Sequence, residues 1–152
     1  MQAKYDRLVT YPVDEVMVAI SNHLHDWKIG KVEKVDKRTE FNGLQVKLGS
    51  LRLRTFNKSG ICCVECGLEA THFALEKNPM DVNYHLNLWG FNEDGKEILF
   101  THDHILARSL GGADNLSNTQ TMCSVCNFAK GREEQAELLR RKEEKSKAME
   151  TA

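Results

Sequence analysis

The 152-residue sequence has no long apolar stretch and almost no net charge. None of its apolar runs approaches the roughly 20 residues of a membrane-spanning helix, and its N-terminus lacks the apolar core of a signal peptide. We therefore expect a cytoplasmic protein with no membrane partner, in which cysteines stay reduced and paired cysteines more often hold a metal ion. The formal net charge of −1 argues against a strongly basic nucleic-acid-binding protein.

Internal repeats and long low-complexity segments are also missing, and 41% hydrophobic and 28% charged residues are ordinary for a globular protein. The charges are unevenly placed. Residues 1–60 contain 11 Lys and Arg against 7 Asp and Glu, whereas residues 61–100 contain 2 against 7. The basic surplus makes the N-terminal part the better candidate for a phosphate-facing surface, although simple solvation of the surface explains the same charges.

The N-terminal region, residues 1–59, is predicted to contain one helix and two strands. Apolar residues recur at helical spacing over 12–27, and acidic residues in the first turn suit the helix dipole. The segments 44–48 and 51–53 alternate between apolar and polar residues, as half-buried strands do. The region matches no motif that would name its role.

Arg52 and Arg54 are candidate phosphate contacts in this region. In a strand they would share one face, opposite Leu51 and Leu53, because successive side chains point to opposite faces. A solvated strand face is the alternative interpretation.

Beyond the N-terminal region, strands are expected at 84–91 and 98–101, joined by a turn at 92–95 that contains Asn, Asp and Gly. A Gly- and Asn-rich loop over 108–118 precedes a short helical segment around 121–129.

Gly131 is expected to break this helix. The last stretch, residues 132–152, is rich in Glu, Lys and Arg and is predicted to form an exposed helix that frays into a tail. Together the patterns predict an α+β fold in three parts: 1–59, 60–131 and 132–152.

Four of the five cysteines form two C-x-x-C pairs, Cys63 with Cys66 and Cys123 with Cys126. Two such pairs supply four thiolates, the number that a tetrahedral structural zinc ion takes. A disulfide, or buried thiols that act as small apolar groups, are the alternatives. Cys62 is left over, and it could replace Cys63, but the two-residue spacing favours Cys63. The long segment between the pairs indicates a zinc clamp on a scaffold rather than a base-reading finger.

One segment places an acid directly beside a histidine. His104 is a candidate general base, because neutral imidazole accepts a proton near neutral pH. The Asp103 carboxylate and the Asn127 amide oxygen are hard ligands that suit Mg²⁺ or Mn²⁺, and such an ion would stabilise charge on a phosphate group. Arg108 and Lys130 are candidate phosphate contacts.

A geometric objection applies to this set. Neighbours on a regular strand point to opposite faces, so Asp103 and His104 can share a groove only if the strand bends or ends there. His102 and His104 would lie on one face, which makes His102 a rival base or metal ligand.

These residues resemble the HNH endonuclease family, also called ββα-metal nucleases. The resemblance covers about residues 60–131, and its matching elements are Asp103-His104-Ile105, Gly111-Gly112, Asn118, the cysteine pairs, Asn127 and Lys130-Gly131. The resemblance implies a ββα-metal nuclease core with a structural zinc, DNA as the substrate and one catalytic divalent ion.

The resemblance also implies the role of each residue. His104 corresponds to the general base, Asp103 and Asn127 to the metal ligands, and Asn118 to the asparagine that braces the loop and orients His104. Asn127 stands where the family's name has histidine, a variant that mainly affects the preferred metal. The compact layout resembles small phage-encoded members, and for such a protein the host cytoplasm is the expected location.

We therefore predict a metal-dependent DNA endonuclease that nicks or cuts duplex DNA. A non-catalytic zinc-dependent DNA-binding or regulatory module is the main alternative, although such a module has no need of Asp103, His104 and Asn127 together. A structural zinc protein that acts through protein contacts is supported only by the acidic middle region.

Overall fold

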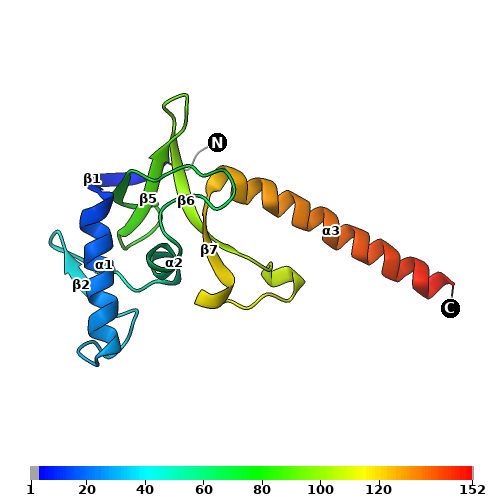
Figure 1. Cartoon of the computed structure of the whole chain (residues 1–152), viewed down its shortest axis with the longest axis horizontal. Coiled ribbons are helices and arrows are strands. Elements are labelled where there is room, and N and C mark those ends of the chain that lie inside the picture. Colours follow the sequence, from blue (N-terminus) through cyan, green and yellow to red (C-terminus); the bar gives the residue numbers. More distant parts are fainter. Residues whose placement is uncertain (1–3, 152) are drawn as a thin grey trace.

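The computed structural model describes residues 4–151, which form a mixed fold of helices and antiparallel sheets (Figure 1). The larger sheet has five strands in the order β1-β4-β5-β6-β7, each antiparallel to its neighbours. These strands are β1 (Asp6–Pro12), β4 (His72–Lys77), β5 (His85–Phe91), β6 (Glu97–His104) and β7 (Thr119–Cys123). A separate hairpin pairs β2 (Arg38–Phe41) with β3 (Leu44–Lys47). The predicted α+β class is confirmed.

The described part of the chain contains three α-helices, α1 (Val13–Lys28), α2 (Leu51–Ser59) and α3 (Ser124–Glu150). Helices α2 and α3 both pack against β6 and β7. Thr55 of α2 shares a hydrogen bond of 2.7 Å with Thr119, which lies opposite His104 in the strand register. Lys130 of α3 instead contacts Asp103, the preceding residue of β6. Because successive strand residues point to opposite faces, α2 and α3 cover opposite faces of the β6–β7 hairpin.

Apolar side chains from α1, α2 and the sheet form the buried core. Phe56, Phe73 and Phe100 are fully buried in it, and the first two meet edge to face with ring centroids 6.5 Å apart. Within the described residues, no helix combines the length and the apolar composition that crossing a membrane requires.

The predicted N-terminal helix is confirmed as α1, and the strand predicted at 44–48 is confirmed as β3. The strand predicted at 51–53 is wrong, because these residues open α2. Ser50 is the helix N-cap, and its Oγ accepts a hydrogen bond from the Leu53 amide at 3.3 Å. A short run of alternating residues does not by itself distinguish a strand from the first turn of a helix.

The predicted helix around 121–129 is partly wrong, because its first residues form β7. The predicted break at Gly131 is also wrong, since α3 passes through this residue without interruption. A glycine inside a helix costs only about 1 kcal/mol relative to alanine, which a long helix tolerates. In Figure 1 the C-terminal part of α3 extends away from the rest of the molecule.

Besides β7, three strands were not predicted: β1, β2 and β4. The β4 segment is buried at four consecutive positions, so it lacks the alternation by which half-buried strands are recognised. Strand β1 pairs with β4, and the N-terminal region thereby joins the same sheet as the strands that carry the candidate site.

Candidate functional site

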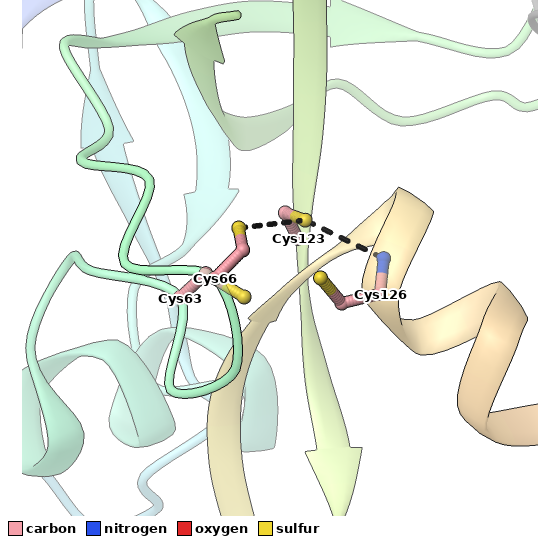
Figure 2. Close-up of side chains that lie close together, drawn as sticks. All are labelled: Cys63, Cys66, Cys123 and Cys126. Atoms are coloured by element: carbon pink, nitrogen blue, oxygen red, sulfur yellow. Dashed lines mark hydrogen bonds between the residues drawn. The ribbon is translucent and has the colours of Figure 1, made fainter.

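Four cysteine side chains converge between the loop after α2 and the junction of β7 with α3 (Figure 2). The sulfur atoms of Cys63, Cys66, Cys123 and Cys126 all lie within 4.8 Å of one another. These are the four cysteines of the two C-x-x-C pairs. Cys62 is exposed and lies outside the cluster.

Backbone contacts hold the first pair in a tight turn. The Gly67 amide donates to the Cys63 carbonyl at 2.9 Å, and the Cys63 amide donates to the Leu68 carbonyl at 2.9 Å. Gly67 has a φ of 79°, a conformation that favours glycine. The Val64 amide also donates to the Thr121 carbonyl at 3.1 Å, which docks this turn on β7.

The second pair lies where β7 becomes α3. Cys123 occupies the N-cap position of α3, and its sulfur accepts a hydrogen bond from the Cys126 amide at 3.5 Å. Burial raises the pKa of the Cys123 and Cys126 thiols. At Cys63 burial also acts to raise the pKa, but backbone hydrogen bonds outweigh it and lower the pKa to about 7. The cluster is thus chemically suited to a cation that stabilises thiolates.

The end of β6 presents its side chains to two different surroundings. Asp103 faces α3 and is only 5% exposed. His102 and His104 lie on the other face, with their ring centroids 5.7 Å apart. The strand ends at His104, which is the condition under which an acid and a histidine that are neighbours in sequence can border one space.

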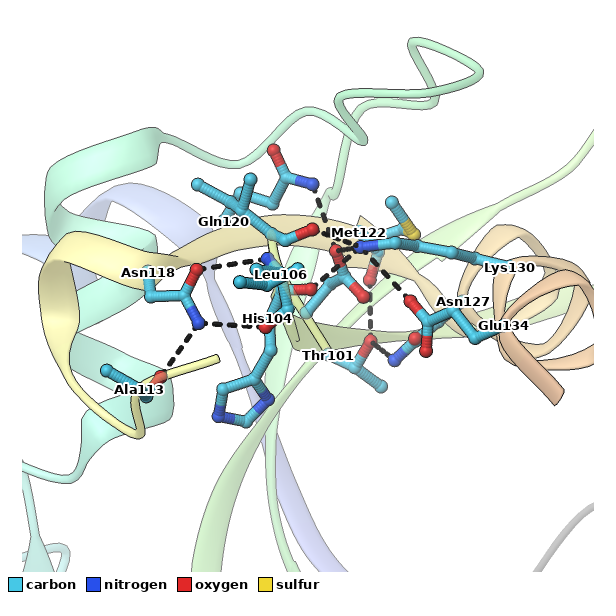
Figure 3. Close-up of polar contacts among 12 residues, drawn as sticks. Thr101, His104, Leu106, Ala113, Asn118, Gln120, Met122, Asn127, Lys130 and Glu134 are labelled. Atoms are coloured by element: carbon cyan, nitrogen blue, oxygen red, sulfur yellow. Dashed lines mark hydrogen bonds and ion pairs between the residues drawn. The ribbon is translucent and has the colours of Figure 1, made fainter. Parts of the chain in front are cut away.

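Hydrogen bonds from Gln120 and Lys130, both labelled in Figure 3, fix the Asp103 carboxylate on the α3 side. Its Oδ2 accepts from the Lys130 ammonium at 2.6 Å and from the Gln120 side-chain amide at 2.9 Å. Lys130 also donates to the backbone carbonyl of His104 at 2.7 Å. Lys130 therefore holds the carboxylate and the end of the strand together, a role that the sequence did not indicate.

Asn127 approaches the same face from the first turn of α3. Its Nδ2 donates to the Thr101 hydroxyl at 2.8 Å, and Thr101 lies two residues before Asp103 on the same face of β6. Among the described residues, none donates a hydrogen bond to the amide oxygen of Asn127.

The His104 ring pairs with an acid that the sequence reading missed. His104 Nε2 lies 2.8 Å from Asp114 Oδ1. The hydrogen bond from His104 lowers the pKa of Asp114, and the charge of Arg108 adds to this shift. Asp114 is the one acidic residue in the loop over 108–118, and this feature of the sequence could have identified it as a partner of His104.

Asn118 braces the loop that carries Asp114. Its side chain accepts from the Leu106 amide at 3.0 Å, and donates to the carbonyls of Leu106 at 2.9 Å and Ala113 at 2.7 Å. The loop is packed closely, since a Cβ added at Gly112 would lie 1.7 Å from the Leu106 carbonyl oxygen. The loop that presents Asp114 to His104 is thus held to the end of β6.

A cavity of about 240 Å³ lies at this end of β6, with residues from both faces of the strand in its wall. Five of the predicted site residues line it: His102, Asp103, His104, Arg108 and Asn127. Burial lowers the pKa of His102, and the charges of Arg52 and His104 lower it further. The cavity therefore brings a carboxylate, an amide and two imidazoles to one space.

The two N-terminal arginines do not share a strand face. Arg54 turns back to the start of its own helix, where its Nε donates to the Gly49 carbonyl at 3.1 Å. Arg52 is half-buried and points toward β5, where its Nη2 lies 3.4 Å from the Leu86 carbonyl. The prediction that Arg52 and Arg54 share one strand face is therefore wrong, and their contacts with phosphate stay a prediction.

Residues 92–143 match the family described as HNH endonuclease. The matched segment runs from the turn before β6 through β7 into α3, so it contains every predicted catalytic residue and the second cysteine pair. The first cysteine pair precedes it. Comparison with the curated proteins and with the solved structures gives no match.

Proposed function

We propose that this chain is a metal-dependent endonuclease that hydrolyses phosphodiester bonds of DNA, because residues 92–143 match the family described as HNH endonuclease. The observation that carries the proposal is the cavity at the end of β6, where Asp103, His104 and Asn127 converge. The succession of β6, β7 and α3 supports a ββα-metal core, because two antiparallel strands are followed directly by a helix that packs on them.

His104 is the proposed general base. A carboxylate at Asp114 can only accept, so the Nε2 of His104 carries the proton of that hydrogen bond. This leaves Nδ1 to take a proton from water, whose oxygen attacks the phosphorus while the bond to the leaving oxygen breaks. Asp114 orients the ring and stabilises the positive charge that develops on it, and Asn118 holds the loop in place.

Asp103 and Asn127 are the proposed ligands of the divalent ion. Both line the cavity, and carboxylate and amide oxygens are the donors that Mg²⁺ and Mn²⁺ prefer. Lys130 and Gln120 both occupy Oδ2 of Asp103, so Oδ1 is the oxygen left for the ion. When bound, the ion would neutralise charge on the phosphate and on the leaving oxygen.

The cysteine cluster is proposed to hold one structural zinc ion. Tetrahedral bonds of about 2.3 Å would place the sulfurs about 3.8 Å apart, and the sulfurs of Cys66 and Cys123 are 3.9 Å apart. The ion would tie the loop after α2 to the strand and helix that carry Asn127.

The first test is the conversion of supercoiled plasmid. The purified protein should produce nicked or linear DNA with Mg²⁺ or Mn²⁺, should stop when EDTA is added, and should recover when Mg²⁺ is returned in excess. Equal cleavage in EDTA would contradict the metal-dependent mechanism. Intact plasmid under all conditions, with DNA binding retained, would favour a non-catalytic zinc-dependent DNA-binding module.

The second test separates the two histidines that line the cavity. His104→Ala should lower the cleavage rate by about 10²–10⁴-fold, the typical contribution of a general base, while zinc content and DNA affinity stay unchanged. His102→Ala is the matched control and should cost much less. If His102→Ala is inactive and His104→Ala still cuts, the base has been assigned to the wrong residue.

A further inference from the structure

A second cavity, of about 310 Å³, adjoins the candidate catalytic cavity at His102. His102 lines both cavities. The remaining wall comes from the N-terminal region and from β5, and its polar residues include Lys47, Ser50, Arg52 and His85. Apart from His102, the residues of its wall lie outside the segment that matches the HNH family.

The lining of this cavity carries positive charge without a balancing acid. Lys47 and Arg52 line it, and none of the described residues in its wall is Asp or Glu. Glu76, a buried acid whose charge acts on Arg52, already accepts hydrogen bonds from Arg7, Asn87 and Trp89. The charge of Arg52 thus has no carboxylate of its own in this wall.

Arg52 has hydrogen-bonding capacity to spare. Its Nε is buried and has no hydrogen-bond partner within the described residues, and the 3.4 Å contact of Nη2 with the Leu86 carbonyl is long. Burial lowers the pKa of Arg52, and the nearby charges of Tyr5 and Glu76 only partly offset this cost. An anion in the adjacent cavity would supply an anionic partner.

A third cation lies next to this group. Arg38 and Lys47 are directly opposite each other in the β2–β3 hairpin, an arrangement that destabilises a sheet when both residues are charged. The Nη1 of Arg38 is buried without a partner within the described residues. Burial lowers the pKa of His85, and the charges of Arg52, Arg38 and Lys47 also lower it, against the opposing charge of Asp81.

The helix α2 begins at the cavity. Ser50, its N-cap, and Leu51, its first residue, both line the wall. The Leu53 amide already donates to Ser50 Oγ, but the first amides of a helix have no carbonyl partner within the helix, and the first turn of α2 contains no acidic residue. A helix N-terminus beside cationic side chains is a suitable environment for a phosphate group.

We propose that this cavity is a phosphate subsite, in which Lys47, Arg52 and the N-terminus of α2 hold a backbone phosphate of the DNA strand next to the cleaved phosphodiester. The identity of the ligand as DNA rests on the proposed endonuclease function, whereas the phosphate chemistry rests on the cavity itself. The shared wall at His102 places one phosphate site beside the other. The N-terminal region would in this way determine which phosphodiester of the DNA strand lies in the catalytic cavity.

The test compares Lys47→Gln and Arg52→Gln with Lys96→Gln, an exposed lysine in the turn at the opposite end of β6. Duplex DNA affinity is measured across a salt titration without added divalent ion, so that binding is read without cleavage. Each cavity variant should bind about tenfold more weakly at moderate salt and lose about one unit of the salt slope, as expected for one lost phosphate contact. Arg52→Lys, which keeps the charge, should retain most of the affinity, and Lys96→Gln should match the wild type.

Inorganic phosphate distinguishes the source of the ligand. If the variants bind DNA normally but lose a phosphate-induced rise in Tm that the wild type shows, the cavity takes free phosphate and the DNA assignment is wrong. If neither DNA nor phosphate distinguishes Lys47→Gln from the wild type, the subsite is refuted. Lys47 is only half-buried, so this variant remains informative if Arg52→Gln does not fold.

The plasmid assay separates this proposal from the proposed function. If the wild type cuts DNA and both cavity variants bind and cut it normally, the phosphate subsite is refuted and the endonuclease function is supported. If the wild type does not cut DNA but the variants bind DNA more weakly than it does, the phosphate subsite is supported and the endonuclease function is refuted.

Discussion

His104 is held from two directions, through its ring and through its backbone. Asp114 contacts the ring, and Lys130 contacts the carbonyl. The sequence motif predicted the histidine, the acid before it and the two asparagines. It did not predict Asp114 as a partner, because whether that acid reaches His104 depends on how the loop folds, and the loop is fixed by Asn118.

Asp114→Asn should lower kcat by about tenfold while KM changes little, because the amide no longer holds the imidazole in one tautomer or stabilises its charge. This is part of the roughly 10²–10⁴-fold that a general base contributes. Steady-state cleavage with varied DNA concentration gives both constants. Asp94→Asn, in the exposed turn before β6, is the control. A rise in KM at unchanged kcat would instead assign Asp114 to DNA binding.

At the level of elements, the sequence predicted well where amphipathic periodicity is long and failed where segments are short or fully buried. The sixteen residues of α1 give a clear helical pattern. The start of α2 alternates in polarity for only four residues, and its Ser50 cap was the stronger signal. The helix α3 continues through Gly131, and the pair of Lys130 and Glu134, 3.5 Å apart, adds a small stabilisation across the glycine.

Gly131→Ala should raise the free energy of unfolding by about 0.5–1 kcal/mol, since Gly131 lies inside a helix and an added Cβ would meet no atom within 4 Å. Urea unfolding followed by circular dichroism measures this change. Gly95→Ala is the contrasting control, because Gly95 has a φ of 75° and alanine there should destabilise the protein. A loss of stability in Gly131→Ala would mean that the helix bends at this residue in solution.

At the scale of the whole molecule, two long-range connections join the candidate site to the rest of the chain. The pairing of β1 with β4 places the N-terminal region on the same sheet as β6. The cysteine cluster joins the loop after α2 to the start of α3. The spacing of the cysteines predicted the second connection, whereas nothing in β1 predicted the first, because strand pairing over such a separation leaves no local pattern.

The cysteine cluster gives a prediction for the stability of this arrangement. Cys63→Ser should lose the bound zinc ion and lower the free energy of unfolding by about 3 kcal/mol or more, because metal binding and folding are coupled. Cys62→Ser is the matched control: it changes the adjacent residue, whose exposed thiol lies outside the cluster, and should keep one zinc ion per chain. Elemental analysis of protein purified without added metal, together with urea unfolding, measures both effects. Cys123 and Cys126 border the turn of α3 that carries Asn127, so we also expect the loss of zinc to weaken DNA cleavage. This effect should appear while the helix α1 is still folded. A severe effect of Cys62→Ser beside a silent Cys63→Ser would show that the zinc ion uses the other cysteine.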